Sequence, residues 1–343
     1  MKKNILTKIT AICIFTTVFT IIACKKNNIP KQNAQISVVA TTFPCYDAAR
    51  AVLGDTLLDG TAELKLLVKP GAESHSFDPS PADIIAITNS DLFIYVGGES
   101  DAWVKKIFNS NTEKNKNSEL RLFDFVETLD EEHFDSEEHL DEHKNHSEEE
   151  SKDLKDGQNQ NIHEQDEHIW TSPKNEIAIV KAVCKSLQEV AAQKQLFQLV
   201  EEFEQNANNY CEQIANVSME IAQIVLNAKE KYIVMGDRFP FIYFAKYYGL
   251  EYDAAFSGCS TAVEASSATI SRLIDKIKTL GLPAVFYIEL GNHKIADIIS
   301  ESANVPAILL QSCQNVSKKD FENAETWVSL MKKNALALKR GLR

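Results

Sequence analysis

Short apolar runs alternate with amphipathic segments along most of the chain. The first runs lie at residues 36–44, 63–70 and 91–98, and segments with helical spacing follow the first two. The same alternation resumes in the last third of the chain, with runs at residues 231–236, 251–256, 284–290 and 307–312. Strand-length apolar runs that alternate with helices are typical of a parallel sheet covered by helices on both faces.

Two long polar-apolar segments separate these two regions. Residues 175–195 have the spacing of a helix, and residues 196–229 contain neither Gly nor Pro, so they predict a second helix about 45 Å long. The predicted fold class is therefore α/β, with two lobes that each hold a mainly parallel sheet flanked by helices. The expected domains are an N-terminal lobe (36–193), a linking backbone helix (194–229) and a C-terminal lobe (230–343).

The first residues have the pattern of a secretory signal. Residues 1–24 combine a lysine-rich start with an apolar core, and they end in Ile-Ile-Ala-Cys, which resembles a bacterial lipobox with Cys24 as the lipidated residue. A transmembrane anchor is the alternative, but the apolar stretch is shorter than the ~20 residues that a span needs. Residues 25–35 resemble a polar tether. We therefore expect an extracytoplasmic protein, lipid-anchored to a bacterial membrane at the cell surface or in the periplasm.

The negative charge of the chain lies mainly in one segment. The formal net charge is −13, and Glu127 to His168 hold 17 acidic residues and three lysines, which leaves about +1 for the other residues. This acidic charge balance argues against a nucleic-acid-binding protein, which would need a basic patch. The segment from about residue 127 to residue 165 lacks apolar periodicity, and this composition predicts a disordered insertion. Its interleaved imidazoles and carboxylates predict weak auxiliary metal sites at His133, His139, His143, His146 and His163.

Two loops carry candidate metal ligands. His75 lies in PGAESHSFDPSPAD, after the second predicted strand, and His168 lies in DEHIWTSPKN, just before a helix whose start is marked by Ser172 and Pro173. Loops at the carboxyl ends of parallel strands are where open α/β sheets bind ligands. A single loop histidine is weak evidence for a metal site, and it is the combination of the two segments that matters.

Together these segments resemble the zinc- and manganese-specific substrate-binding proteins of bacterial ABC transporters, the TroA-like family. VVATTFPCYDAAR and YFAKYYGLEY are similar to further motifs of that family, and the likeness runs from about residue 36 to the carboxyl terminus. The resemblance implies one transition-metal ion between the lobes, delivered to a membrane permease driven by an ATPase. Zn²⁺ is the expected ion, because the His-rich insertion is typical of zinc-specific members, and Mn²⁺ is the alternative. The protein is expected to be a monomer.

The resemblance also implies particular site residues. It assigns His75 and His168 as the first-lobe ligands. The second lobe departs from the family pattern, with Arg238 at a ligand position unless one residue is inserted, so Asp237 and Glu289 are the expected second-lobe ligands. The remaining candidates are residues expected to support or surround these ligands: Asp78, Asp166, Glu167, Arg238 and Glu264.

The cysteines leave several arrangements open. Cys259 and Cys313 lie in loops expected to reach the cleft, where they could form a disulfide, ligate the metal or stay free. Cys184 and Cys211 lie on consecutive predicted helices and could pair or be two buried thiols. Together with Cys45 they make an odd number of thiols beyond Cys24, so not all of them can pair with one another.

Two other function classes are alternatives to metal transport. A secreted metallohydrolase would hold a catalytic zinc with the same histidines, but the sequence contains no H-E-x-x-H, P-loop or G-x-S-x-G motif, so no enzyme is predicted. A cell-adhesion or metal-buffering lipoprotein remains open, because the same body could serve that role as well.

Overall fold

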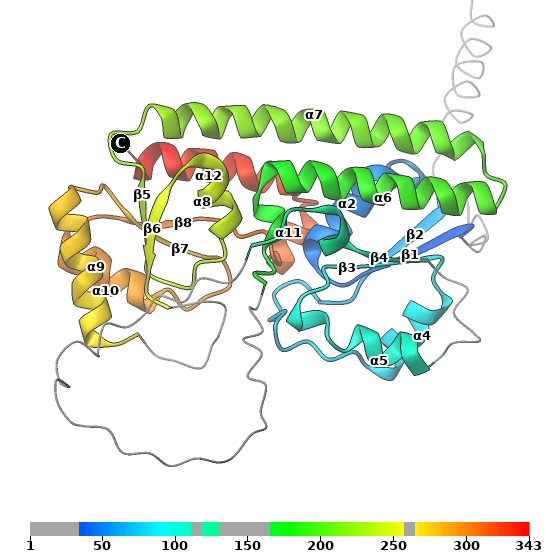
Figure 1. The fold of residues 1–343 in the computed structure, drawn as a ribbon, viewed down its shortest axis with the longest axis horizontal. Helices are drawn as coiled ribbons and strands as arrows, with labels where there is room; N and C mark the ends of the chain where they lie inside the picture. The colour runs from blue at the N-terminus through cyan, green and yellow to red at the C-terminus, as the bar shows by residue number, and fades with distance from the viewer. Residues whose placement is uncertain (1–33, 111–117, 130–164, 257–264, 343) are drawn as a thin grey trace, which may run out of the picture. The chain divides into compact units, whose positions relative to one another are not determined.

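A computed structural model describes residues 34–110, 118–129, 165–256 and 265–342 of the chain (Figure 1). Gln35–Arg343 make up one compact unit. Several predictions lie outside the described residues: the signal, Cys24, nearly all of the tether, the five histidines of the insertion, Cys259 and Glu264. They stay predictions.

Four parallel strands form the first sheet, in the order β2–β1–β3–β4. They are β1 (Ile36–Ala40), β2 (Ala62–Leu66), β3 (Leu92–Tyr95) and β4 (Ser118–Arg121). The helices of this region are α2 (Phe43–Leu53), α3 (Thr56–Asp59), α4 (Pro81–Asn89), α5 (Val104–Ser110) and α6 (Pro173–Gln193). Val38 and Val39 are both almost fully buried although they point to opposite faces of β1, as expected for a sheet covered on both sides.

The second sheet repeats this arrangement, with parallel strands in the order β6–β5–β7–β8. They are β5 (Tyr232–Met235), β6 (Glu251–Ala254), β7 (Val285–Tyr287) and β8 (Ala307–Leu309). The helices here are α8 (Ile242–Tyr248), α9 (Ser267–Leu280), α10 (Lys294–Ala303), α11 (Lys318–Glu322) and α12 (Trp327–Gly341). Two sheets of four parallel strands confirm the predicted α/β class.

One long helix lies against both halves. Helix α7 (Gln198–Leu226) has 29 residues and packs on α6, α2 and α12 (Figure 1). The largest buried cluster runs from Val38 in the first sheet, through α6, α7 and α12, to Phe286 in the second. Because the two halves share this core, a wide rotation of one against the other would expose apolar surface.

The predicted strand at residues 36–44 is shorter than expected. It ends at Ala40, and α2 begins at Phe43 with Pro44 in its first turn. Proline suits the start of a helix because its fixed φ is helical and it has no N–H to leave unpaired. Apolar content alone could not separate the strand from the buried helix start.

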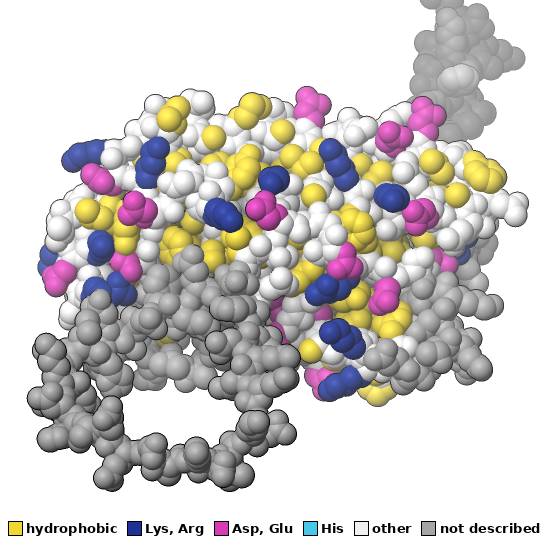
Figure 2. Space-filling view, in the orientation of Figure 1, with side chains coloured by type: hydrophobic (Ala, Val, Ile, Leu, Met, Phe, Trp, Pro, Cys, Tyr) yellow, Lys and Arg dark blue, Asp and Glu magenta, His cyan; other side chains and the backbone are white. Residues whose placement is uncertain are grey.

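The charges of the described surface are mixed. On the face drawn in Figure 2, basic and acidic side chains are interspersed over the described residues, in keeping with the near-zero net charge outside the acidic segment. Within the described ranges, no helix is both long and apolar enough to cross a membrane.

Candidate metal centre

The two candidate histidines meet beside the carboxyl ends of the first sheet. His75 lies in the loop after β2, and His168 immediately precedes a short 3-10 helix, Ile169–Thr171. Their ring centroids are 5.8 Å apart, in an edge-to-face arrangement. The strand order changes direction between β1 and β3, and loops diverge at such a point, which leaves a crevice for a ligand.

His75 is held by residues of three segments: the short 3-10 helix Glu99–Asp101, the residue before His168 and the loop after β8. Its Nδ1 lies 3.1 Å from Ser100 Oγ and 3.8 Å from Glu167 Oε2, and its Nε2 lies 2.8 Å from Gln314 Nε2. The backbone N–H of Ser100 donates to Glu167 Oε1 at 2.6 Å. Gly98 permits this approach, since a Cβ there would lie 2.4 Å from the Glu167 side chain.

His168 is almost completely buried, with its side chain 1 % exposed. Asp166 Oδ1 accepts from the His168 backbone N–H at 2.8 Å and lies 3.2 Å from Nδ1 of the ring. Tyr243, on α8, donates its hydroxyl to the Asp166 carbonyl at 2.7 Å. The loop that carries His168 is thus fixed by a residue of the second half.

The surroundings of His75 favour a neutral ring. Burial lowers its pKa below the ordinary value of 6.5, and the neighbouring His168 lowers it further. Glu167 and Glu73 act in the opposite direction with smaller effect. A neutral imidazole has a free lone pair on one nitrogen, which is the form that binds zinc.

The second-half candidates Asp237 and Arg238 lie at the carboxyl end of β5. Asp237 is 9 % exposed, and its Oδ1 accepts from the Arg238 backbone N–H at 2.9 Å. Burial raises the pKa of Asp237. The Arg238 guanidinium lies 3.6 Å from Glu73 Oε2, two residues before His75 along the chain.

Glu289 binds a neighbouring loop of its own half. Its Oε1 accepts from Ser312 Oγ at 2.6 Å and its Oε2 accepts from the Ser312 backbone N–H at 2.7 Å. Ser312 Oγ in turn accepts from the Gln314 backbone N–H at 3.2 Å. Glu289 is therefore linked to the histidine pair through Ser312 and Gln314.

The structure brings together His75, His168, Asp166 and Glu167. Within the described part of the chain, no three His, Cys, Asp or Glu side chains are grouped closely enough to hold a metal ion. Asp237 and Glu289 are thus not gathered onto the histidines, and Asp78 is exposed. Their assignment, like that of the histidines as ligands, stays a prediction.

The cysteines of the described residues are not paired with one another. Cys184 and Cys211, whose pairing was left open, are both free thiols, and so is Cys45. Cys313 is buried with φ at 60°, and Cys259, with which a disulfide was one of three arrangements left open, lies outside the described residues.

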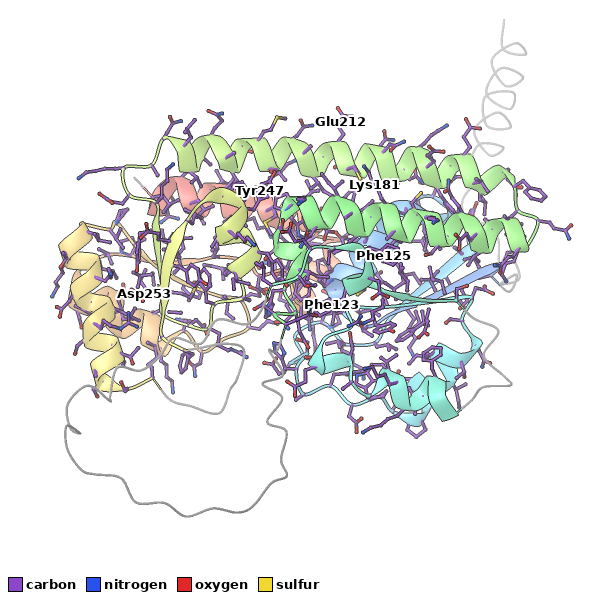
Figure 3. The ribbon with its side chains drawn as sticks, in the orientation of Figure 1. Phe123, Phe125, Lys181, Glu212, Tyr247 and Asp253 are labelled. Atoms are coloured by element: carbon purple, nitrogen blue, oxygen red, sulfur yellow. The ribbon has the colours of Figure 1, made fainter. Side chains whose placement is uncertain are left out.

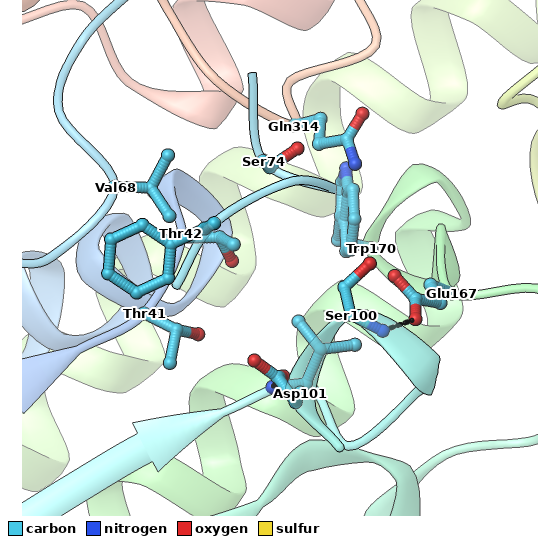
Figure 4. A pocket seen from close by; sticks show the side chains of 11 residues that line it. Thr41, Thr42, Val68, Ser74, Ser100, Asp101, Glu167, Trp170 and Gln314 are labelled. Atoms are coloured by element: carbon cyan, nitrogen blue, oxygen red, sulfur yellow. Dashed lines mark hydrogen bonds between the residues drawn. The ribbon is translucent and has the colours of Figure 1, made fainter. Parts of the chain in front are cut away.

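A small cavity of about 10 Å³, room for one water molecule, lies beside the histidines (Figure 4). Glu167, Trp170 and Gln314 line it together with Asp101. Burial raises the pKa of Asp101 to about 7, although the carboxylate accepts hydrogen bonds from the N–H groups of Val96 and Gly97.

Sequence reasoning missed three residues of this centre: Ser100, Tyr243 and Gln314. Residues 307–316 contain no acidic side chain, and the amide of Gln314 has no sequence signal that marks it as part of a metal site. Tyr243 belongs to a quoted motif, but its hydroxyl reaches Asp166 only through the tertiary fold.

Comparison with known proteins supports the likeness found in the motifs. The zinc-binding lipoprotein AdcA of Streptococcus pneumoniae is 27 % identical over 320 residues, which cover 93 % of this chain and 58 % of the relative. The high-affinity zinc uptake system protein ZnuA of Bacillus subtilis is 26 % identical over 338 residues. The aligned region covers 94 % of this chain and 94 % of that protein. The chain thus spans less than two thirds of the AdcA relatives and nearly all of ZnuA.

A solved structure has a similar fold. The Zn(II)-bound ZnuA-like domain of S. pneumoniae AdcA superposes with a TM-score of 0.67 at 26 % identity, over 90 % of this chain and 98 % of that domain. Residues 38–341 match the family described as zinc-uptake complex component A, periplasmic. Because the match covers most of the chain, this protein belongs to that family of zinc-uptake components.

Proposed function

We propose that this protein is an extracytoplasmic receptor that captures a divalent transition metal, most favourably Zn²⁺, and delivers it to the permease and ATPase of an ABC transporter. Cys24 would anchor it to the membrane through lipid. The single observation that carries the proposal is the pair His75 and His168, whose rings lie 5.8 Å apart at the crevice of the first sheet. Family membership supports the same activity.

The chemistry of the pair suits zinc. Zn²⁺ takes nitrogen, sulfur and oxygen donors in a tetrahedral site, and imidazole suits it well. Asp166 and Glu167 lie against the Nδ1 atoms of His168 and His75, at 3.2 and 3.8 Å. Carboxylates in these positions favour the Nδ1–H tautomer, which leaves each Nε2 lone pair for the ion.

The second half supplies the remaining donors in this proposal. Asp237 and Glu289 are the predicted ligands, and both carboxylates would have to reach the histidine pair after exchanging their present hydrogen bonds to Arg238 and Ser312. Carboxylate donors favour Mn²⁺ relative to an all-imidazole set, so manganese is the alternative cargo if both engage.

The test is the metal content of the purified protein. We compare wild type with His75→Ala, His168→Ala and the control Gln188→Leu, which removes the α6 side chain that donates to the Val200 carbonyl at 2.9 Å, away from the candidate ligands. The first two variants should lose the tight zinc equivalent, while the control keeps it. Full stoichiometric zinc in both His75→Ala and His168→Ala would overturn the proposed site.

A further inference from the structure

We propose that Gln314 is a latch that closes the metal-binding nitrogen of His75 in the metal-free protein. The latch is the hydrogen bond from Gln314 Nε2 to His75 Nε2, 2.8 Å long. Zinc has to displace this bond to enter, so Gln314 sets the affinity and the entry rate of the site. The inference rests on the proposed function, because it assumes that His75 binds the ion.

The surroundings of the ring decide which group donates. The Glu167 carboxylate lies 3.8 Å from Nδ1 of His75, and Ser100 Oγ lies 3.1 Å from the same nitrogen. A nearby negative charge stabilises a proton on Nδ1, so in the neutral ring Nε2 carries the lone pair. That lone pair accepts the N–H of the Gln314 amide. The same lone pair is the one that a metal ion would take.

The loop that presents Gln314 is firmly attached to the first half. We call residues 312–316 the strap. Trp170 Nε1 donates to the Ser312 carbonyl at 2.8 Å, and Asn315 Nδ2 donates to the carbonyls of Lys69 and Ala72 at 2.9 and 2.8 Å. The N–H of Gly71 donates to the Val316 carbonyl at 2.8 Å. These bonds join the strap to the loop that carries His75 and to the segment that follows His168.

Glu289 supports the strap from the other side. Its carboxylate accepts two hydrogen bonds from Ser312, whose hydroxyl accepts from the backbone of Gln314. The strap backbone is therefore held at both ends, and opening the latch needs only a rotation of the Gln314 side chain. In this arrangement Glu289 is a positioning residue for Gln314.

The expected effect follows from competition. A protein whose binding nitrogen is free for only a fraction of the time has its metal affinity reduced by that fraction. Removing one ordinary hydrogen bond should therefore tighten zinc binding roughly two- to tenfold. Zinc should also associate faster with the unlatched protein.

The test compares zinc dissociation constants in wild type, Gln314→Leu and Gln314→Ala, measured by chelator competition at pH 7.5. Gln188→Leu is the matched control, since Gln188 Nε2 donates to the Val200 carbonyl at 2.9 Å away from the site. Both Gln314 variants should bind zinc more tightly, and the control should equal wild type. Unchanged or weaker binding would overturn the latch, and weaker binding would make Gln314 a metal donor through its carbonyl oxygen.

Two further measurements separate a failure of the latch from a failure of the proposed function. Imidazole ¹⁵N spectra of metal-free wild type, which need no variant, should show His75 with its proton on Nδ1, and a proton on Nε2 would contradict the latch. If His75→Ala and His168→Ala keep their zinc, the proposed function fails as a whole. If both lose it while the Gln314 variants match wild type, only the latch is refuted.

Discussion

A buried carboxyl on α6 gives the most direct test of the folded core. Glu176 is 0 % exposed, and neither of its side-chain oxygens has a hydrogen-bond partner among the described residues. Burial raises the pKa of Glu176 well above 4.5, and the nearby Asp47 carboxylate raises it further. Glu176 therefore retains its proton in the folded protein at pH values where the unfolded chain has lost it.

The sign of the effect on stability follows from this difference. Below pH 4.5 Glu176 is protonated in both states, whereas above it only the folded state keeps the proton. The free energy of unfolding should then fall by about 1.4 kcal/mol for each pH unit between 4.5 and the raised pKa of the folded state. Glu176→Gln is neutral in both states, so this contribution disappears from its pH dependence.

Urea denaturation at pH 5.5 and 6.5 measures the effect. The free energy of unfolding of wild type, relative to Glu176→Gln, should fall from the lower to the higher pH, by at most about 1.4 kcal/mol for this one pH unit. Burial also raises the pKa values of Tyr210 and Cys313 beside Glu176, so these groups stay protonated throughout. Glu212→Gln is the control, because Glu212 is exposed on the outer face of α7 (Figure 3). Parallel pH profiles for wild type and Glu176→Gln would refute the reasoning.

Three further outcomes are expected. The pKa of His75 is lowered below 6.5, so zinc affinity should hold down to about that pH and fall only below it, and a calorimetric affinity that already drops markedly between pH 7.5 and 6.5 would contradict this. Gly236→Ala would bring a Cβ to 2.5 Å from the Cα of Ala296, so it should lower the free energy of unfolding by about 1–3 kcal/mol, and an unchanged urea midpoint would argue against that clash. Deleting residues 131–164 should remove only weak zinc equivalents in a titration, and losing the tight one would show that the insertion belongs to the main site.

The sequence predicted a helix or strand correctly where the spacing of apolar residues agreed with the residues that mark where an element begins or ends. The start of α6 was marked by Ser172 and Pro173, and in the structure Ser172 Oγ accepts from the N–H of Asn175 at 3.5 Å. Strand β4 was missed because SELR is short and largely polar, with Leu120 as its one buried residue. Its place in the sheet comes from pairing with β3, which is a tertiary effect.

The candidate site could be predicted only in part, for a similar reason. His75 and His168 stood in long motifs and were found without a structure. Gln314 carries no charge and follows a strand of the other half, so only its 2.8 Å contact with His75 identified it. Glu289 was predicted to be a metal ligand because it is acidic. In the structure its carboxylate accepts two hydrogen bonds from Ser312.

The strap also determines when the site can form during folding. The bond between Gln314 and His75 joins residues 239 positions apart, and the bond between Asn315 and Lys69 spans 246 positions. Contacts of such separation form only after a large part of the chain has been ordered. A growing chain that lacks its last thirty residues or so would have both histidines but no strap to hold the His75 loop. Completion of the carboxyl terminus is therefore a condition for a fully built candidate metal centre, even though both histidines lie in the first half of the chain.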